Sequence, residues 1–161
     1  MASGSEIERK FLVAELPDDL GRHPAEPIEQ GYIAFEGPVE VRLRRRAGRA
    51  LLTVKSGAGR IRVEEEFEID ERRFGSLWPL SEGRRVSKTR HLIPGDGGLT
   101  IELDVYTGDL EGLVVVEVEF ESEERSDAFE PPGWFGPEVT DDLRYANRAL
   151  AVDGLPSEPG P

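Results

Sequence analysis

Residues 6–13, Glu6-Ile7-Glu8-Arg9-Lys10-Phe11-Leu12-Val13, form the stretch that decides the fold. In a β-strand successive side chains point to opposite faces, so Glu6, Glu8 and Lys10 share one side and Ile7, Phe11 and Val13 share the other. A single row of this kind is typical of a solvated strand face. The same alternation recurs along most of the chain, and the stretch is therefore the first strand of a predicted sheet with one charged face.

The composition predicts one domain of a soluble protein. The 161 residues can form a single packed core, and the absence of cysteine excludes disulfides and thiolate metal sites. The longest apolar run, Leu113–Val116, is too short to cross a bilayer, and the N-terminus lacks a signal-peptide pattern. A net charge of -13 disfavours broad attraction to nucleic acids or anionic membranes. We therefore expect a cytoplasmic monomer or homodimer, with one domain over residues 1–152 and a disordered tail over residues 153–161.

Eight segments have the period of two that predicts β-strands. They are residues 6–13, 30–35, 39–46, 51–55, 61–69, 86–90, 99–106 and 113–121. Short turns such as Gly37-Pro38 and Gly95-Asp96-Gly97-Gly98 join most of them, which indicates an antiparallel meander. Residues 14–27 are rich in Pro, Asp and Gly and predict a loop with at most one helical turn.

Three short helices are expected beside the strands. Asp70 caps the first, which ends at Pro79, and Ser122 caps the second, which ends at Phe129. The proline-rich residues 131–137 cannot continue the second helix. Thr140 is expected to cap a last helix whose packed face carries Leu143, Ala146, Ala149 and Leu150.

Two architectures fit strands with one apolar and one charged face. One is a barrel with an apolar core and a charged exterior. The other is a sheet closed around a polar interior, with helices over its apolar outside. Periodicity does not separate them.

The charges on the polar faces are segregated by sign. The basic residues are Lys10, Arg42, Arg44, Lys55, Arg62, Lys88 and Arg90, and the acidic residues are Glu6, Glu8, Glu64, Glu66, Glu68, Glu102, Asp104, Glu117 and Glu119. Arg and Lys bind phosphate oxygens, whereas carboxylates bind hard cations such as Mg²⁺ or Mn²⁺. With His23 and His91 as the only histidines, a zinc site is disfavoured. The pattern predicts a site for a multiply charged anion and a divalent cation, with cross-strand salt bridges on a solvated sheet as the alternative.

The assembled residues resemble the CYTH family, also called triphosphate tunnel metalloenzymes. Glu6-x-Glu8-x-Lys10 matches the family's ExExK signature. The other matching elements, in family order, are Arg42-x-Arg44, Lys55, Glu66-x-Glu68, Lys88-x-Arg90, Glu102-x-Asp104 and Glu117-x-Glu119. Residues 30–32, 134–136 and 142–145 are similar to those of the small bacterial members that hydrolyse inorganic triphosphate.

The resemblance implies an α+β, mainly β fold: an eight-stranded antiparallel closed barrel with a polar lumen, flanking helices and a C-terminal plug helix. It implies substrate binding by Lys10, Arg42, Arg44, Lys55, Arg62, Glu66, Glu68, Lys88, Arg90, Arg144 or Arg148, and Tyr145. One or two Mg²⁺ or Mn²⁺ ions would bind Glu6, Glu8, Glu102, Asp104, Glu117 and Glu119. Glu6, Glu8, Lys10 and Tyr32 would be catalytic, and either a second metal ion or the Glu6 and Glu8 carboxylates themselves would orient and deprotonate the attacking water.

The expected reaction is hydrolysis of tripolyphosphate to pyrophosphate and phosphate. The same scaffold also carries class IV adenylate cyclases and thiamine or nucleoside triphosphatases, which need a pocket for a base or a thiazolium. The sequence contains no added segment or aromatic cluster for one, which favours the inorganic substrate. A non-catalytic polyphosphate-binding module is the remaining alternative, although a pure binder has less need of the acidic residues.

Overall fold

The computed structural model describes residues 7–57 and 62–157, apart from the side chain of Arg62. The described strands form one antiparallel sheet in the order β5-β4-β3-β2-β6-β7-β8-β1-β9. They are β1 Ile7–Val13, β2 Ala25–Glu36, β3 Val39–Arg46, β4 Arg49–Gly57, β5 Arg62–Ile69, β6 Arg85–Pro94, β7 Thr100–Tyr106, β8 Val114–Phe120 and β9 Phe135–Glu138. All eight predicted strands are present, and the ninth, β9, was not predicted.

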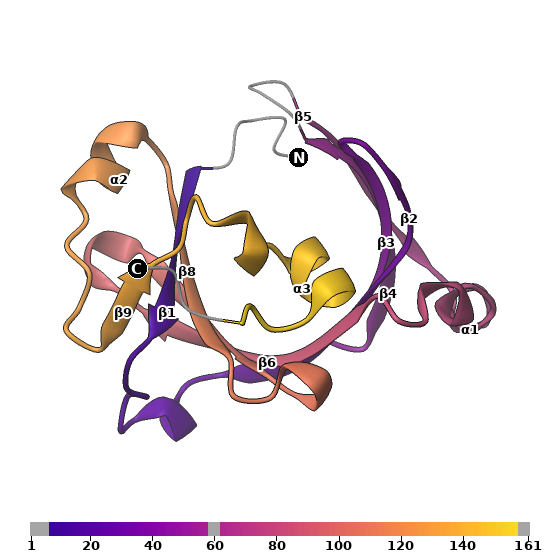
Figure 1. Cartoon of the computed structure of the whole chain (residues 1–161). Coiled ribbons are helices and arrows are strands. Elements are labelled where there is room, and N and C mark those ends of the chain that lie inside the picture. The colour runs from indigo at the N-terminus through magenta and orange to yellow at the C-terminus, as the bar shows by residue number, and fades with distance from the viewer. Residues whose placement is uncertain (1–6, 58–61, 158–161) are drawn as a thin grey trace.

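The sheet is strongly curved but is not closed (Figure 1). Its two edges are β5 and β9, and within the described residues neither β1 nor β9 pairs with β5. The predicted eight-stranded closed barrel is therefore wrong in strand number, and its closure is not observed. The physical reason lies at β1, where β9 pairs at Phe11 and Val13 along the edge that β5 would need for closure.

Strand β9 escaped prediction because its sequence is rich in breakers. Pro132 lies just before the strand and Pro137 within it. Proline removes a backbone donor, but an edge strand tolerates it because one side of its ladder is unpaired. The strand is held by Val139 N–H, which donates to the Lys10 carbonyl oxygen at 2.8 Å, just past its end.

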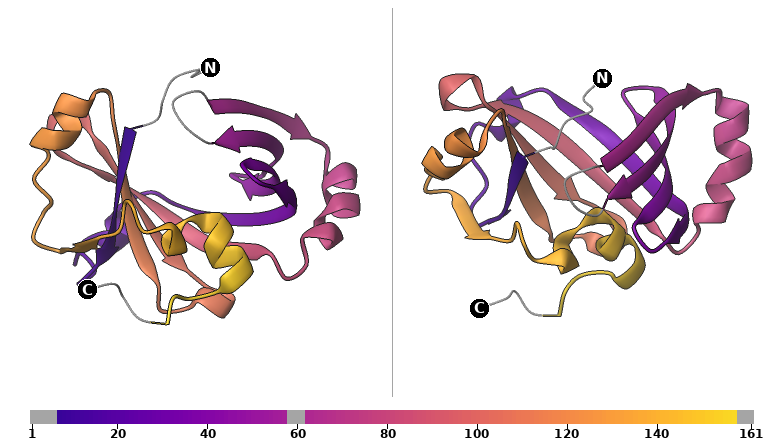
Figure 2. Two further views of the ribbon diagram at one scale, coloured as in Figure 1. Left: turned by 45° about the horizontal axis from the view of Figure 1, so that its top comes forward. Right: turned by 90° about the horizontal axis from the view of Figure 1, so that it is seen from above.

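Helices cover the convex face of the sheet on two sides. The helices are α1 Glu71–Leu77, α2 Glu123–Ala128 and α3 Asn147–Asp153. Asp70 and Ser122 cap the first two as predicted, with side chains that accept from Arg73 N–H and Arg125 N–H. Figures 1 and 2 show α1 and α2 outside the curved sheet, and Figure 1 shows α3 within its concavity. Of the two architectures left open by the sequence, the polar interior is therefore the one observed.

Three apolar clusters follow this arrangement. Phe74 of α1 packs with Leu43 on the convex face of β3 and β4. Phe11, on the convex face of β1, belongs to a second cluster with Phe129, which follows α2. Leu150 of α3 packs with Val115 on the concave face. The last cluster fills one end of the concavity and leaves the other end to charged residues.

The last helix differs from the prediction. Thr140 does not cap it, because its hydroxyl donates to Glu138 at 2.6 Å and accepts from Lys10 N–H at 3.0 Å. The chain instead forms a 3₁₀ turn, Leu143–Tyr145, before α3 begins at Asn147. Leu143 is 80% exposed and contributes nothing to the packed face.

The remaining described segments are mainly 3₁₀ turns and the end of the chain. The predicted loop over residues 14–27 contains the 3₁₀ turn Leu20–Arg22, but β2 begins earlier than expected, at Ala25. Other 3₁₀ turns are Trp78–Ser81, Asp96–Gly98 and Gly108–Leu110. Asp153 ends α3, while residues 158–161 of the predicted tail lie outside the described residues. In the described chain, no helix is both long and apolar enough to cross a membrane.

Candidate active site

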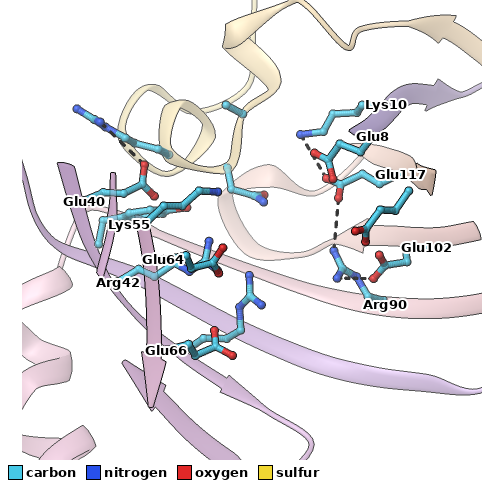
Figure 3. Close-up of a pocket in the computed structure, with 16 residues that line it drawn as sticks. Glu8, Lys10, Glu40, Arg42, Lys55, Glu64, Glu66, Arg90, Glu102 and Glu117 are labelled. Carbon is cyan, nitrogen blue, oxygen red and sulfur yellow. Dashed lines mark ion pairs between the residues drawn. The ribbon is translucent and has the colours of Figure 1, made fainter. Parts of the chain in front are cut away.

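The concave face holds a cavity of about 350 Å³ lined mainly by ionisable side chains. Its lining residues are Glu8, Lys10, Tyr32, Glu40, Arg42, Arg44, Lys55, Glu64, Glu66, Arg90, Glu102, Glu117, Glu119, Ala146, Asn147 and Arg148. Figure 3 shows two groups of these side chains facing each other across open space, one with Arg42, Lys55, Glu40, Glu64 and Glu66 and the other with Glu8, Lys10, Arg90, Glu102 and Glu117. We call the cations on β3 and β4 (Arg42, Arg44 and Lys55) the basic wall, and the carboxylates on β1, β7 and β8 (Glu8, Glu102, Glu117 and Glu119) the acidic wall.

The basic wall consists of cations with little carboxylate pairing. Arg42 approaches one carboxylate, that of Glu64, at 3.9 Å. Arg44 is held by an uncharged group, because its Nε donates to Gln30 Oε1 at 2.8 Å. Burial and the charges of Arg42 and Arg90 lower the pKa of Arg44 to about 10. Such crowding of like charge is relieved when an anion binds.

The acidic wall places like charges opposite one another. Glu8 faces Glu119 between β1 and β8, and Glu102 faces Glu117 between β7 and β8. Like charges directly opposite in a sheet are destabilising unless a cation lies between them. Burial raises the pKa of Glu102, and the neighbouring Glu117 carboxylate adds to the rise.

Arg90 on β6 connects the two walls and is anchored by acids. Its Nε and Nη2 donate to both carboxylate oxygens of Asp104, at 2.7 and 2.8 Å, and its Nη1 lies 2.6 Å from Glu102. Lys88 Nζ lies 2.9 Å from the same Asp104, whose side chain is fully buried. Burial alone would raise the pKa of Asp104, but the hydrogen bonds from Arg90 and the charge of Lys88 outweigh it and lower the pKa. This bidentate geometry fixes the Arg90 guanidinium.

The site can be compared with known proteins on this basis. The CYTH domain family matches residues 4–131 of the chain. The chain belongs to the CYTH domain family. It is 50% identical over 149 residues to an inorganic triphosphatase of Nitrosomonas europaea. The aligned residues are 92% of this chain and 97% of that protein. An inorganic triphosphatase of Acetivibrio thermocellus is 36% identical over 151 residues, which are 91% of this chain and 93% of that protein.

A solved crystal structure supports the same relationship. It is that of an inorganic triphosphatase with 47% sequence identity and a TM-score of 0.75. The match covers 97% of each chain. The CYTH relationship therefore extends past the family match, through β9 and α3.

Most residues that the sequence predicted for the CYTH site line the cavity. These are Glu8, Lys10, Tyr32, Arg42, Arg44, Lys55, Glu66, Arg90, Glu102, Glu117 and Glu119. Glu6 and the side chain of Arg62 lie outside the described residues. Their predicted roles stay predictions.

Five predicted residues are not among those lining the cavity. Lys88 and Asp104 are buried beneath Arg90. Glu68 lies on an exposed part of β5 and pairs with Arg49 at 3.2 Å. Arg144 is about half exposed and pairs with Asp142. Tyr145 is buried, and its carbonyl oxygen accepts from Lys10 Nζ at 3.0 Å, so it contacts the site through its backbone.

The CYTH cavity also contains residues that the prediction left out of the site. Glu64 and Glu40 lie two positions before Glu66 and Arg42 on the same strand faces, so strand alternation alone could have found them. Asn147, which the prediction did not name, and Arg148, which it named as the alternative to Arg144, reach the cavity because α3 packs inside the sheet. The plug helix implied by the family resemblance indicated that packing.

The donor chemistry of the acidic wall fits a hard divalent cation. Carboxylate oxygens are the ligands that Mg²⁺ and Mn²⁺ prefer, and the opposed carboxylates have charge to neutralise. Within residues 7–57 and 62–157, however, no three acidic or histidine side chains converge as a preformed cage. Glu102 turns toward Arg90, and Glu117 lies 3.3 Å from Lys10. A cation would therefore compete with these two ion pairs for the carboxylates.

Proposed function

We propose that this chain hydrolyses inorganic triphosphate to pyrophosphate and phosphate in the cavity between the two walls. The observation that carries the proposal is the opposition, across one small cavity, of the basic wall, whose cations have few carboxylate partners, and the acidic wall, whose carboxylates face one another between strands. Its dimensions and charge suit a short polyphosphate with a divalent cation. The 50% identity to an inorganic triphosphatase over nearly the whole chain supports the same substrate.

The basic wall would bind the substrate. Arg42 and Arg44 present guanidinium groups that match phosphate oxygens in pairs, and Lys55 adds a point charge. Arg90 would contact the same anion from β6, with Lys88 and Asp104 acting beneath it as positioning residues. Phosphoryl transfer is catalysed mainly by such positioning and charge stabilisation.

The acidic wall, together with Glu6, would hold one or two Mg²⁺ or Mn²⁺ ions. When bound, such an ion neutralises phosphate charge and lowers the pKa of a coordinated water. Glu8, with Glu6, would orient the attacking water and accept its proton. The water oxygen then bonds to a terminal phosphorus while the bond from that phosphorus to the bridging oxygen breaks, and pyrophosphate leaves.

The cavity lining supports an inorganic substrate rather than a nucleotide or thiamine triphosphate. Tyr32 is the one aromatic residue among the described lining residues, and it is 1% exposed. A base or thiazolium would find no open aromatic face to stack on. We further propose that the protein acts in the cytoplasm, as a monomer or homodimer, without a nucleic-acid or membrane partner.

Phosphate release tests the proposal directly. Tripolyphosphate, ATP, thiamine triphosphate and pyrophosphate are each incubated with Mg²⁺, Mn²⁺ or EDTA, and cyclic AMP is assayed in the ATP reaction. We expect metal-dependent turnover of tripolyphosphate well above that of the other compounds. Cyclic AMP formation would assign a cyclase instead, and tight polyphosphate binding without turnover would assign a binding module.

A further inference from the structure

Gln30 is a fully buried amide beside the cavity, and it was not among the predicted site residues. It lies on β2 with 0% exposure, opposite Arg44 of β3 and two residues before Tyr32 on the same face. Its side chain contacts both neighbours. Arg44 Nε donates to Gln30 Oε1 at 2.8 Å, and Gln30 Nε2 lies 2.7 Å from the Tyr32 hydroxyl oxygen.

The chemistry of arginine fixes the orientation of this amide. A guanidinium can only donate hydrogen bonds, so the Gln30 atom facing Arg44 must be the carbonyl oxygen. The amide nitrogen then faces Tyr32, and an amide nitrogen can only donate. The Tyr32 oxygen is therefore the acceptor in this contact.

This leaves the Tyr32 hydroxyl hydrogen without a partner among the described residues. Gln30 makes the only hydrogen bond to that hydroxyl in the described chain. A β-bulge falls immediately after Tyr32, where the register between β2 and β3 shifts, and Tyr32 lines the cavity. Bulges beside functional sites commonly redirect a side chain. Burial raises the pKa of Tyr32, which keeps the hydroxyl protonated near neutral pH.

We propose that Gln30 is a positioning residue that fixes Tyr32 as a hydrogen-bond donor to a phosphate oxygen of the substrate, while it anchors Arg44 beside the same anion. The inference rests on the proposed function for the identity of the anion. In this arrangement Tyr32 donates to the substrate and does not remove a proton from the attacking water. One uncharged amide thus sets the direction of two contacts, one from Tyr32 and one from Arg44 of the basic wall.

A double-mutant cycle with Gln30→Glu and Tyr32→Phe tests this assignment. The introduced carboxylate can still accept from Arg44, but as an acceptor it also draws the Tyr32 hydroxyl hydrogen away from the cavity. The dissociation constant for tripolyphosphate is measured by calorimetry in EDTA, and kcat/KM is measured with Mg²⁺. We expect Tyr32→Phe to weaken binding about 10-fold, and Gln30→Glu to weaken it about 10- to 100-fold.

The double-mutant cycle separates the effect on the direction of the Tyr32 hydroxyl hydrogen bond from the effect of the added negative charge. The charge acts in both backgrounds, whereas the effect on hydroxyl direction exists only when Tyr32 is present. The increase in the dissociation constant for tripolyphosphate caused by Gln30→Glu should therefore be about 10-fold smaller in the Tyr32→Phe background than in the wild type. Equal losses in both backgrounds would overturn the assignment. If Gln30→Glu does not fold, Tyr32→Phe decides alone, because unchanged tripolyphosphate affinity would show that the hydroxyl donates nothing.

The binding measurement also distinguishes this inference from the proposed function. Wild-type protein that binds tripolyphosphate without hydrolysing it would refute the proposed function, and the dissociation constants of the variants would still decide the role of Gln30. Wild-type protein that does not bind tripolyphosphate would overturn both.

Discussion

The two walls of the cavity use their charges in different ways. On the acidic side and at Arg90, each cation is held by carboxylates: Asp104 binds both Arg90 and Lys88, and Glu117 lies beside Lys10. On the basic side, Arg44 is held by an amide, and Arg42 has one distant carboxylate neighbour. Paired cations stabilise the fold, whereas unpaired ones retain their capacity to bind an anion.

The difference in pKa direction expresses the same contrast. Burial alone lowers the pKa of a guanidinium, and at Arg44 nearby cations deepen the effect. At Arg90 the Asp104 carboxylate outweighs burial and raises the pKa. Similar residues on β3 and β6, the two strands that flank β2, therefore lie in opposite electrostatic environments. Substitutions on each side should have different consequences, for stability at Arg90 and for anion binding at Arg44.

The largest effect is expected for Asp104→Asn, which leaves two buried cations without a neutralising carboxylate. Breaking a buried ion pair from one side costs about 3–5 kcal/mol, and we expect the free energy of unfolding in urea to fall by that amount. Glu64→Gln is the matched control, because the Arg42–Glu64 pair is partly exposed at 3.9 Å and should contribute less than about 1 kcal/mol. If Asp104→Asn lowers the free energy of unfolding by less than about 1 kcal/mol, the buried ion pairs around Asp104 do not stabilise the fold more than the Arg42–Glu64 pair does.

The same variant has a predictable pH dependence. Because the folded-state pKa of Asp104 is lowered, its stabilisation is present above the unfolded pKa, about 3.9, and is lost as pH falls through the folded value. The stability difference between wild type and Asp104→Asn should therefore narrow on acidification below about pH 4. A difference that widens on acidification would contradict the assigned ion pairs.

Arg44→Ala should have the next largest effect, on substrate binding. Removing a guanidinium that contacts a phosphate costs roughly 1.5–3 kcal/mol, which corresponds to a loss in kcat/KM for tripolyphosphate of about 10- to 100-fold. The control is Arg49→Ala, because Arg49 pairs with Glu68 on an exposed part of the sheet. We expect the control to stay within about twofold of wild type. Equal losses in the two variants would mean that the basic wall is not the anion site.

Metal binding should sharpen the comparison from the acidic side. Glu102→Gln is expected to weaken Mn²⁺ binding about tenfold in calorimetry, because one carboxylate ligand is lost. Since the pKa of Glu102 is raised, wild-type Mn²⁺ affinity should begin to fall on acidification at a pH above the ordinary glutamate value of about 4.3. Glu29→Gln, outside the cavity and paired with Arg45, should leave the affinity unchanged.

The smallest effect separates two acids of β5. Glu66 lines the cavity and accepts from the Thr53 hydroxyl at 2.9 Å, so Glu66→Gln should lower kcat/KM about three- to tenfold. Glu68→Gln should remain within about twofold of wild type, because Glu68 faces Arg49 instead. A larger loss in kcat/KM for Glu68→Gln than for Glu66→Gln would contradict this separation and would favour the sequence-based prediction that Glu68 belongs to the site.

The sequence predicted strand identity and face well, because both depend on local alternation. Register across strands places Arg42 opposite Tyr32, and Glu117 opposite both Lys10 and Glu102, which is how separate motifs come to share one cavity. Alternation also explains why Glu68 was predicted with Glu66. Glu64, Glu66 and Glu68 share one face, but of the three only Glu64 and Glu66 line the cavity, whereas Glu68 pairs with Arg49 near the end of the strand.

The burial of each charged side chain could not be predicted from strand alternation. Lys88 and Arg90 lie two residues apart on the same face of β6, yet Arg90 lines the cavity while Lys88 is buried against Asp104. Which cation reaches the cavity depends on where α3 and the apolar cluster that contains Leu150 and Val115 fill the concavity. Gln30 was missed for a related reason, since a neutral amide has no charge pattern to mark it.

The sequence by itself determined the strands, the alternation of their faces, the order of the charged motifs and hence the family resemblance, because these properties depend on neighbours along the chain. Only the tertiary structure decided that β9 occupies the edge of β1 and that some charges are neutralised while others remain available. These outcomes depend on contacts between segments far apart in sequence. Burial and pairing, which set the properties of each charge, arise from those contacts.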